Sequence, residues 1–368
     1  MATVGLIGAG NFTGQVLLPA LKKTGAELKI IASSGGVSGT HLGKKFGFEQ
    51  STTDVEKIIR DPGINTVFIT TRHNTHARLA LEALRAGKHV FVEKPLCLTL
   101  EELNEFTAFY HSHHSLSTTS IKSATSTIST THHPSSTYHA PSAQHAPSTI
   151  STTSTTQHAS PLLMVGFNRR FAPQVVKMKE LLEATRGPKS FIMTVNAGFI
   201  PVNHWTQDQK VGGGRVIGEA CHFIDLLRFL AGEAIANSEI VSMKNGSPSG
   251  DTSPAGCGTG DTVTITLSFI DGSIGTVHYF ANGTKAFPKE RLEIFCGGKI
   301  LQLDNFKVLR GYGWKNFKKM KLWRQDKGHV AGVSAFTEAV KKGGPSPIPF
   351  EEIAEVTRTT IELANRSK

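Results

Sequence analysis

Strand-like and helical patterns alternate along the first 110 residues, and this alternation constrains the fold more than any other feature. Residues 4–9 and 64–71 are apolar runs of strand length, whereas residues 75–86 carry apolar side chains at helical spacing and stop at Gly87. Parallel strands need a crossover between them, which is usually a helix. The pattern therefore predicts an α/β protein with a doubly wound parallel sheet.

Other elements of this half follow from the same reasoning. Further strands are expected at 28–33, 89–94 and 162–168, and helices at 13–23 and behind two capping boxes, Thr53-x-x-Glu56 and Thr99-x-x-Glu102. In a capping box the hydroxyl and the carboxylate each accept a hydrogen bond from a backbone N–H in the first turn, which fixes where the helix begins.

The composition changes abruptly at residues 111–160. This segment holds 26 Ser or Thr, eight His, one Lys and no acidic residue, and its few hydrophobic residues follow no pattern. Such a sequence buries too little apolar surface to offset its ordering entropy, so we expect a disordered insertion. The histidines are irregularly spaced, so we expect no metal site there.

The second half has a different pattern, with strands joined by short turns. Strands are expected at 190–198, 262–269, 273–280, 291–296 and 299–304, followed by two helices from about 329. Short turns between consecutive strands indicate a large, mostly antiparallel sheet. We therefore expect a dinucleotide-binding domain at 1–110 and 161–173, the insertion at 111–160, an α/β substrate and oligomerisation domain at 174–340, and a helical segment at 341–368.

The net charge of +11 is concentrated in one region, where residues 299–327 hold nine basic residues against Asp304 and Asp326. Aromatic residues interleave with the lysines, so the region resembles a patch for nucleic acid or a phosphorylated substrate. The alternative is the solvated face of a sheet, which is more common for charged runs. We adopt it and expect no nucleic acid partner.

The sequence also bears on location. The first residues form a strand and a glycine turn instead of the basic and apolar regions of a signal peptide, and no apolar run approaches the roughly 20 residues of a membrane span. The four cysteines have no metal or redox spacing. We expect a cytoplasmic protein with free thiols, no membrane partner and no metal.

The glycine turn Gly8-Ala9-Gly10-Asn11-Phe12-Thr13 comes directly after the first strand and opens a helix. Glycines there let backbone N–H groups approach a pyrophosphate at the positive end of the helix. The turn predicts a Rossmann domain that binds a dinucleotide at Gly8, Gly10, Asn11 and Phe12. Thr13 occupies the place of the third glycine, and a plain tight turn is the alternative.

The second strand indicates which dinucleotide. It ends at Ser33 and Ser34, where an acidic residue would bind the ribose hydroxyls of NAD. Small hydroxyl residues leave room for a 2′-phosphate, and Lys44 and Lys45 follow. The cofactor is therefore expected to be NAD(P), with a slight preference for NADP.

Two groups carry ionisable side chains. Lys94 ends the strand 89–94, and the carboxyl ends of strands line the ligand crevice of such sheets; Lys94 either donates to a substrate hydroxyl or is a surface lysine. Glu219, His222 and Asp225 recur every three residues on a helix, so they share a face that is either catalytic or simply wetted.

Several of these motifs resemble the Gfo/Idh/MocA oxidoreductases, which include glucose–fructose oxidoreductase and inositol dehydrogenase. The similarity is carried by GLIGAGNF, TTRHNTHARLALEALRAGKHVFVEKP, GFNRRF and GGGRVIGEACHFIDLLRFL, and it covers nearly everything except 111–160. It implies a Rossmann domain, a second domain whose open sheet makes homodimers or homotetramers, a tightly held NAD(P), and a sugar, sugar-nucleotide or cyclitol substrate oxidised at a hydroxyl carbon.

The resemblance also implies roles for residues. Lys94 and His222 flank the carbon being oxidised, with Pro95 often cis; His222 is the general base and Lys94 stabilises the alkoxide, while Glu219 or Asp225 orients the imidazole. The further cofactor residues expected are Thr71, His73, Asn74, His76, Glu93 and Lys94. The substrate contacts expected are Arg169, Trp205 and Asp225, with Asn203 and His204 beside them.

Two positions depart from the family pattern. His73 replaces the asparagine of a T-x-N-x-x-H turn, and Gly218 occupies the place of an acid four residues before the catalytic histidine. Glu219, three residues before His222, either replaces that acid or points toward a neighbouring element. A non-catalytic regulator that senses the cofactor or a sugar is the alternative function, although an intact Lys94 and His222 favour an enzyme.

Overall fold

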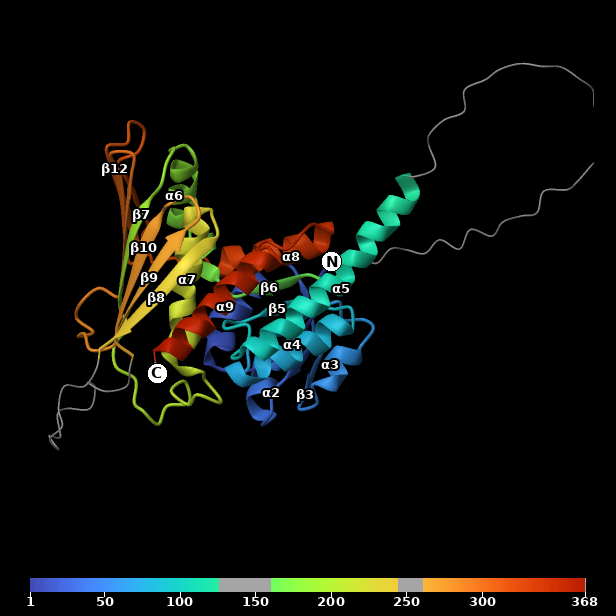
Figure 1. Cartoon of the computed structure of the whole chain (residues 1–368). Coiled ribbons are helices and arrows are strands. Elements are labelled where there is room, and N and C mark those ends of the chain that lie inside the picture. Colours follow the sequence, from blue (N-terminus) through green and yellow to red (C-terminus); the bar gives the residue numbers. More distant parts are fainter. Residues whose placement is uncertain (126–159, 244–260, 368) are drawn as a thin grey trace, which may run out of the picture. The chain divides into compact units, whose positions relative to one another are not determined.

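The computed structural model describes residues 1–125, 160–243 and 261–367 (Figure 1). Its contacts divide the chain into two compact units, Met1–Phe106 with Pro161–Lys368, and Thr107–Ser160. Helix α5 runs from Leu100 to Thr125, so residues 111–125, which we expected to be disordered, are helical. The rest of the expected insertion lies outside the described residues.

The first sheet confirms the expected doubly wound parallel fold. Its strand order is β3-β2-β1-β4-β5-β6, with every pair parallel. The strands are β1 (Thr3–Ile7), β2 (Glu27–Ala32), β3 (Gln50–Thr52), β4 (Thr66–Ile69), β5 (His89–Val92) and β6 (Leu163–Val165). The order reverses between β1 and β4, which is where such sheets bind ligands.

Helices connect these strands largely where the periodicity placed them. They are the π-helical turn η1 (Thr13–Leu17), α1 (Leu18–Lys22), α2 (Val37–Phe46), α3 (Glu56–Arg60), the 3₁₀ turn η2 (His73–Thr75) and α4 (His76–Arg85). Neither α2 nor β3 was anticipated.

The two expected capping boxes have different outcomes. At the start of α5 the box is present, because Thr99 Oγ1 accepts from Glu102 N–H while the Glu102 carboxylate accepts from Leu98 and Thr99. The box at Thr53 is wrong. The carboxylate of Asp54 instead accepts from the N–H of Glu56, because it lies nearer the first turn of α3.

The second sheet has eight strands in the order β14-β13-β12-β11-β7-β10-β9-β8. These are β7 (Ser190–Asn196), β8 (Ile235–Ser242), β9 (Val263–Phe269), β10 (Ile274–Phe280), β11 (Glu290–Cys296), β12 (Lys299–Asp304), β13 (Val308–Tyr312) and β14 (Lys319–Lys321). All neighbours are antiparallel except β7 and β10, which are parallel at the centre. The expectation of a mostly antiparallel sheet is therefore confirmed.

The two faces of this sheet differ. Phe191, Met193 and Val195 of β7 are buried, and Figure 1 shows α6 (Pro173–Glu183) and α7 (Cys221–Ala231) along one face of the sheet. The alternate residue Ile192 of β7 is exposed. The sheet thus has a core face and a face that carries exposed apolar side chains.

The last two helices pack against different parts of the chain. The ring of Phe336, in α8 (His329–Lys342), packs edge-on against Phe68 of β4 and Phe91 of β5. Helix α8 therefore packs with the first sheet, although its place in the sequence assigned it to the second domain. Helix α9 (Phe350–Arg366) packs against α7 and β8. Among the described helices, none has the length and apolar character needed to cross a membrane.

Candidate active site

The glycine turn lies where β1 meets β4, at the reversal of strand order. Gly8 has φ +108°, and a Cβ there would lie 2.7 Å from the backbone of Thr70, so only glycine fits. The Thr70 hydroxyl donates to the carbonyl of Gly8 at 2.9 Å, which ties the two loops together. Gly10, in contrast, has no atom within 4 Å of its would-be Cβ. The space beside Gly10 is open to a ligand, as a pyrophosphate requires.

Thr13 replaces the third glycine without blocking the turn. Its side chain is buried, and its hydroxyl lies 2.8 Å from the hydroxyl of Thr70. Close packing is provided instead by the next residue, since a Cβ on Gly14 would lie 3.0 Å from Leu42 of α2. The glycine needed for helix packing is thus shifted by one position.

The two serines lie at the end of β2 as expected, but the two lysines that follow do not lie beside them. Ser33 Oγ accepts from the N–H of Gly39 at 3.0 Å, while Ser34 is exposed. Lys44 and Lys45 lie in the last turn of α2, and a helix rises about 1.5 Å per residue, which places them about 10 Å along the axis from its start. These lysines therefore do not support the preference for NADP.

Lys94 connects the first sheet to the helix of the second half. It follows β5, its bond to Pro95 is cis, and its Nζ donates to the carbonyl of Gly218 at 2.6 Å. Gly218 lies in a π-helical turn, η4 (Val216–Ala220), that leads directly into α7. Lys94 therefore reaches the turn immediately before His222.

The His222 side chain is buried. Among the described residues, its Nδ1 has no hydrogen-bond partner, which is rare for a buried polar atom. Burial, followed by the charges of Arg169 and Lys94, lowers the pKa of His222 well below 6.5. The imidazole is therefore neutral at pH 7 and retains a lone pair.

Glu219 does not orient the imidazole as expected, because its carboxylate contacts other groups. It accepts hydrogen bonds from Tyr279 of β10 at 2.5 Å, from Arg215 at 3.1 Å and from Lys289 at 3.1 Å. Burial would raise its pKa, but the charge of Lys289 and the hydrogen bond from Tyr279 outweigh this effect and lower it to about 2. The geometry places Glu219 in an ionic network instead of beside the lone pair of His222.

Asp225 and Arg169 are likewise engaged in the protein interior. The Asp225 carboxylate is fully buried and accepts two hydrogen bonds from Arg170, which also pairs with Glu352 of α9. Arg169 is buried, pairs with Glu290 at 2.8 Å and lies over the ring of Phe223. The substrate contacts expected for Asp225 and Arg169 are therefore not supported, because both side chains are buried and paired with other side chains, although Arg169 Nε has no hydrogen-bond partner among the described residues.

The side chains of the turn after β4 lie in three different environments. His76 is fully buried, with Nδ1 2.7 Å from the Pro95 carbonyl oxygen, so it supports the Lys94–Pro95 segment instead of facing a ligand. Thr71 Oγ1 accepts from Thr75, and Asn74 is exposed. The ring of His73 is buried, and Trp205 packs edge-on against it at 4.8 Å.

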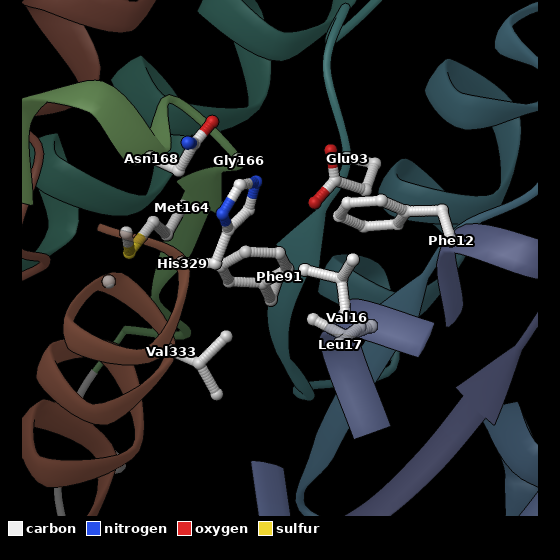
Figure 2. A pocket seen from close by; sticks show the side chains of 11 residues that line it. Phe12, Val16, Leu17, Phe91, Glu93, Met164, Gly166, Asn168, His329 and Val333 are labelled. Atoms are coloured by element: carbon white, nitrogen blue, oxygen red, sulfur yellow. The ribbon is translucent and has the colours of Figure 1, made fainter. Parts of the chain in front are cut away.

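A small pocket lies next to the glycine turn (Figure 2). Glu93 and Phe12 line one side of it, and Asn168 and His329 line the other. Burial, then the charges of Arg169 and Lys327, lowers the pKa of His329 to about 4. Sequence reasoning missed His329, because it is 317 residues from Phe12 and nothing local marks its ring as a neighbour of Phe12.

Glu93 should make stability depend on pH. Burial raises its pKa to about 7 from 4.5, although the charge of Lys94 opposes the shift. A carboxyl group that holds its proton more tightly when folded contributes stability below pH 4.5, and this stability is lost as the pH rises through 7. Glu93→Gln should therefore be more stable than the wild type at pH 8, by at most about 3 kcal/mol, and similar at pH 4.5. Urea unfolding of both proteins across this range measures the difference, and parallel pH profiles would contradict it.

Two family models match the chain. One, described as an oxidoreductase family with an NAD-binding Rossmann fold, matches residues 2–119, and the other, the GFO/IDH/MocA C-terminal domain, matches residues 176–300. The chain belongs to the Gfo/Idh/MocA oxidoreductase family. Its first domain is therefore the NAD-binding Rossmann domain of that family, which confirms the resemblance seen in the sequence.

Individual relatives agree with this membership. A 1,5-anhydro-D-fructose reductase of Ensifer adhaerens is 37% identical over 101 residues, which are 27% of this chain and 30% of the reductase. A myo-inositol 2-dehydrogenase of Thermotoga maritima is 23% identical over 316 residues, which are 84% of this chain and 79% of the dehydrogenase. These relatives are enzymes, and they lend no support to a non-catalytic sensor.

Solved structures share the fold over the whole chain. An oxidoreductase domain protein from Kribbella flavida superposes with a TM-score of 0.76 at 19% identity, covering 100% of this chain and 97% of that one. Levoglucosan dehydrogenase, in complex with NADH and levoglucosan, gives a TM-score of 0.71 at 22% identity, covering 100% and 98%. At these identities the likeness shows the shared fold.

Proposed function

We propose that the protein is a dehydrogenase that oxidises a hydroxyl carbon of a sugar, sugar nucleotide or cyclitol with NAD(P) as the acceptor. One observation carries this proposal. Lys94 reaches the turn that opens α7, next to a buried neutral His222 whose Nδ1 has no partner in the described part of the chain. The neutral imidazole keeps a lone pair, which is what a base for a substrate hydroxyl requires.

The residues around the glycine turn fit a dinucleotide. The open space at Gly10 and the helix that begins beside it accommodate a pyrophosphate, with Asn11 and Phe12 in the first turn and Ser33 and Ser34 at the ribose end. When bound, the nicotinamide supplies the redox chemistry of the reaction. The absence of an acid at the end of β2 is the remaining support for NADP over NAD.

The protein side of the reaction is acid–base chemistry. His222 takes the proton of the substrate hydroxyl, because its neutral ring has a lone pair at physiological pH. Lys94 donates a hydrogen bond to the same oxygen and stabilises the negative charge that develops on it. In this role Lys94 Nζ donates one hydrogen bond to the substrate oxygen and one to the Gly218 carbonyl, since an ammonium group has three N–H donors.

The loop 201–213 is proposed to contact the substrate. Asn203 and His204 are exposed, and Trp205 is partly exposed although it packs against His73. An aromatic face beside a crevice suits the apolar face of a sugar ring. Levoglucosan dehydrogenase, which has the same fold, forms a complex with NADH and levoglucosan, and this supports a sugar-like class of substrate.

Two finer proposals accompany this function. The exposed face of the second sheet carries Ile192, Ile274 and Phe295 on neighbouring strands, and we propose that it forms a homodimer or homotetramer. A cytoplasmic location is proposed as well. Support comes from Cys97, Cys221 and Cys296, which are buried free thiols.

Native mass spectrometry of the purified protein tests these proposals together. We expect a carried-through dinucleotide and a mass of two or four subunits. The intact protein is then assayed with NAD and with NADP against inositols, pyranoses and nucleotide sugars. A protein that binds neither dinucleotide and oxidises none of these substrates would contradict the proposed function.

A further inference from the structure

His73 and Gly218 come from different halves of the chain and touch each other. A Cβ on Gly218 would lie 3.0 Å from Cε1 of His73 and 3.5 Å from its Nδ1, and the first of these distances is too short for an ordinary carbon contact. The backbone at Gly218 does not have a positive φ. Glycine is therefore favoured here by the space that the imidazole occupies, not by the backbone conformation.

The imidazole of His73 is held in a defined orientation. Its Nδ1 lies 2.8 Å from the carbonyl oxygen of Gly212, and because a carbonyl only accepts, Nδ1 carries the proton. Burial, followed by the charge of Lys94, lowers the pKa of His73 to about 3, so the ring is neutral. The ring of Trp205 also packs edge-on against the imidazole. Moving a ring that is fixed in this way, to make room for a side chain at position 218, costs free energy.

Gly218 is also the residue that holds Lys94. Its carbonyl oxygen accepts the 2.6 Å hydrogen bond from Lys94 Nζ. A side chain at position 218 would press on His73, and the resulting shift of the backbone would move this acceptor. Relieving this contact needs a shift of a few tenths of an ångström. Since a displacement of about 1 Å can cost about 100-fold in turnover, the smaller shift should cost several-fold.

We propose that His73 and Gly218 form a matched pair that positions Lys94 for its reaction. The proposal rests on the proposed function for the role of Lys94. The two departures from the family pattern, His73 and Gly218, are then linked, because the histidine occupies the space that a side chain at position 218 would need. His73 is a positioning residue, because it contacts the turn that holds the lysine.

The test is a cycle of variants in the full-length protein. Gly218→Ala adds only the clashing methyl group, and His73→Asn shortens the neighbour while keeping an amide donor for the Gly212 carbonyl. We expect Gly218→Ala to lower kcat by about 3- to 10-fold, with the Kd for the dinucleotide unchanged. The double variant should have the same kcat as His73→Asn alone, to within about 1.5-fold. Gly344→Ala is the matched control, since nothing lies within 4 Å of its would-be Cβ.

Two outcomes would overturn the pairing. One is a Gly218→Ala protein as active as the wild type, and the other is a loss that His73→Asn does not relieve. If the wild type itself oxidises no substrate, the proposed function fails. The pairing is then tested by urea unfolding. The change in unfolding midpoint of the double variant should differ from the sum of the changes in the two single variants. Additive midpoints would contradict the pairing in that case.

Discussion

Replacing His222 with Ala is expected to lower kcat by about 10²- to 10⁴-fold, the range found for loss of a general base. Lys94→Ala should cost about 10²- to 10³-fold, as does removal of one donor to a developing oxyanion. Neither change touches the glycine turn, so dinucleotide binding should persist in both variants. Steady-state kinetics with the best substrate, together with a dinucleotide titration, measures these effects.

A surface histidine provides the control for this experiment. His41 lies on α2 with its side chain exposed and has no role in the proposed mechanism, so His41→Ala should leave turnover unchanged. Because the pKa of His222 lies well below 6.5, its lone pair should still be available when the pH falls from 8 to 6. Full turnover in both the His222 and Lys94 variants would refute the mechanism.

Replacing Asp225 with Ala should reduce stability instead of substrate affinity. Asp225 is fully buried and its two hydrogen bonds, at 2.8 and 2.9 Å, neutralise Arg170. Removing one partner of a buried ion pair typically costs about 3–5 kcal/mol, because the other charge stays buried. Arg170 retains Glu352, so we expect a loss of about 3 kcal/mol in the free energy of unfolding, measured by urea denaturation.

An exposed ion pair supplies the comparison. Glu82 pairs with Arg78 one turn away on α4, where both side chains contact solvent, and Glu82→Ala should cost only about 0.5 kcal/mol. In the Asp225 variant, KM of the folded protein should match the wild type. A large rise in KM without loss of stability would restore the substrate role first expected for Asp225.

Much of the first domain could be predicted because its signals are local. A glycine turn must follow a strand and precede a helix to work, so Gly8 and Gly10 could be placed before any contact was known. Lys94 could be placed by the rule that strand ends line the crevice. The missed elements, α2 and β3, are short and weakly patterned. Their apolar residues, such as Leu42, are too few to give a clear period.

The partners of the buried charges could not be predicted. Arg170 is 55 residues from Asp225 and 182 from Glu352, and local periodicity says nothing about contacts at such separations. The same holds for Tyr279, which lies in a strand that reads as plain core yet donates to Glu219. Glu219 and Asp225 were expected to serve one function because they share a helix face with His222. Tertiary packing instead pairs Glu219 with Tyr279 and Asp225 with Arg170.

The π-helical turn at Val216–Ala220 changes what residue spacing means in this helix. A π turn takes more residues to close than an α turn. Side chains three apart across it are rotated away from a common face, while those four apart are brought nearer to one. Glu219 therefore turns to Tyr279, whereas Gly218 faces the imidazole of His73. When relatives are aligned through this turn, a carboxylate displaced by one residue therefore points in a different direction around the helix and meets different partners.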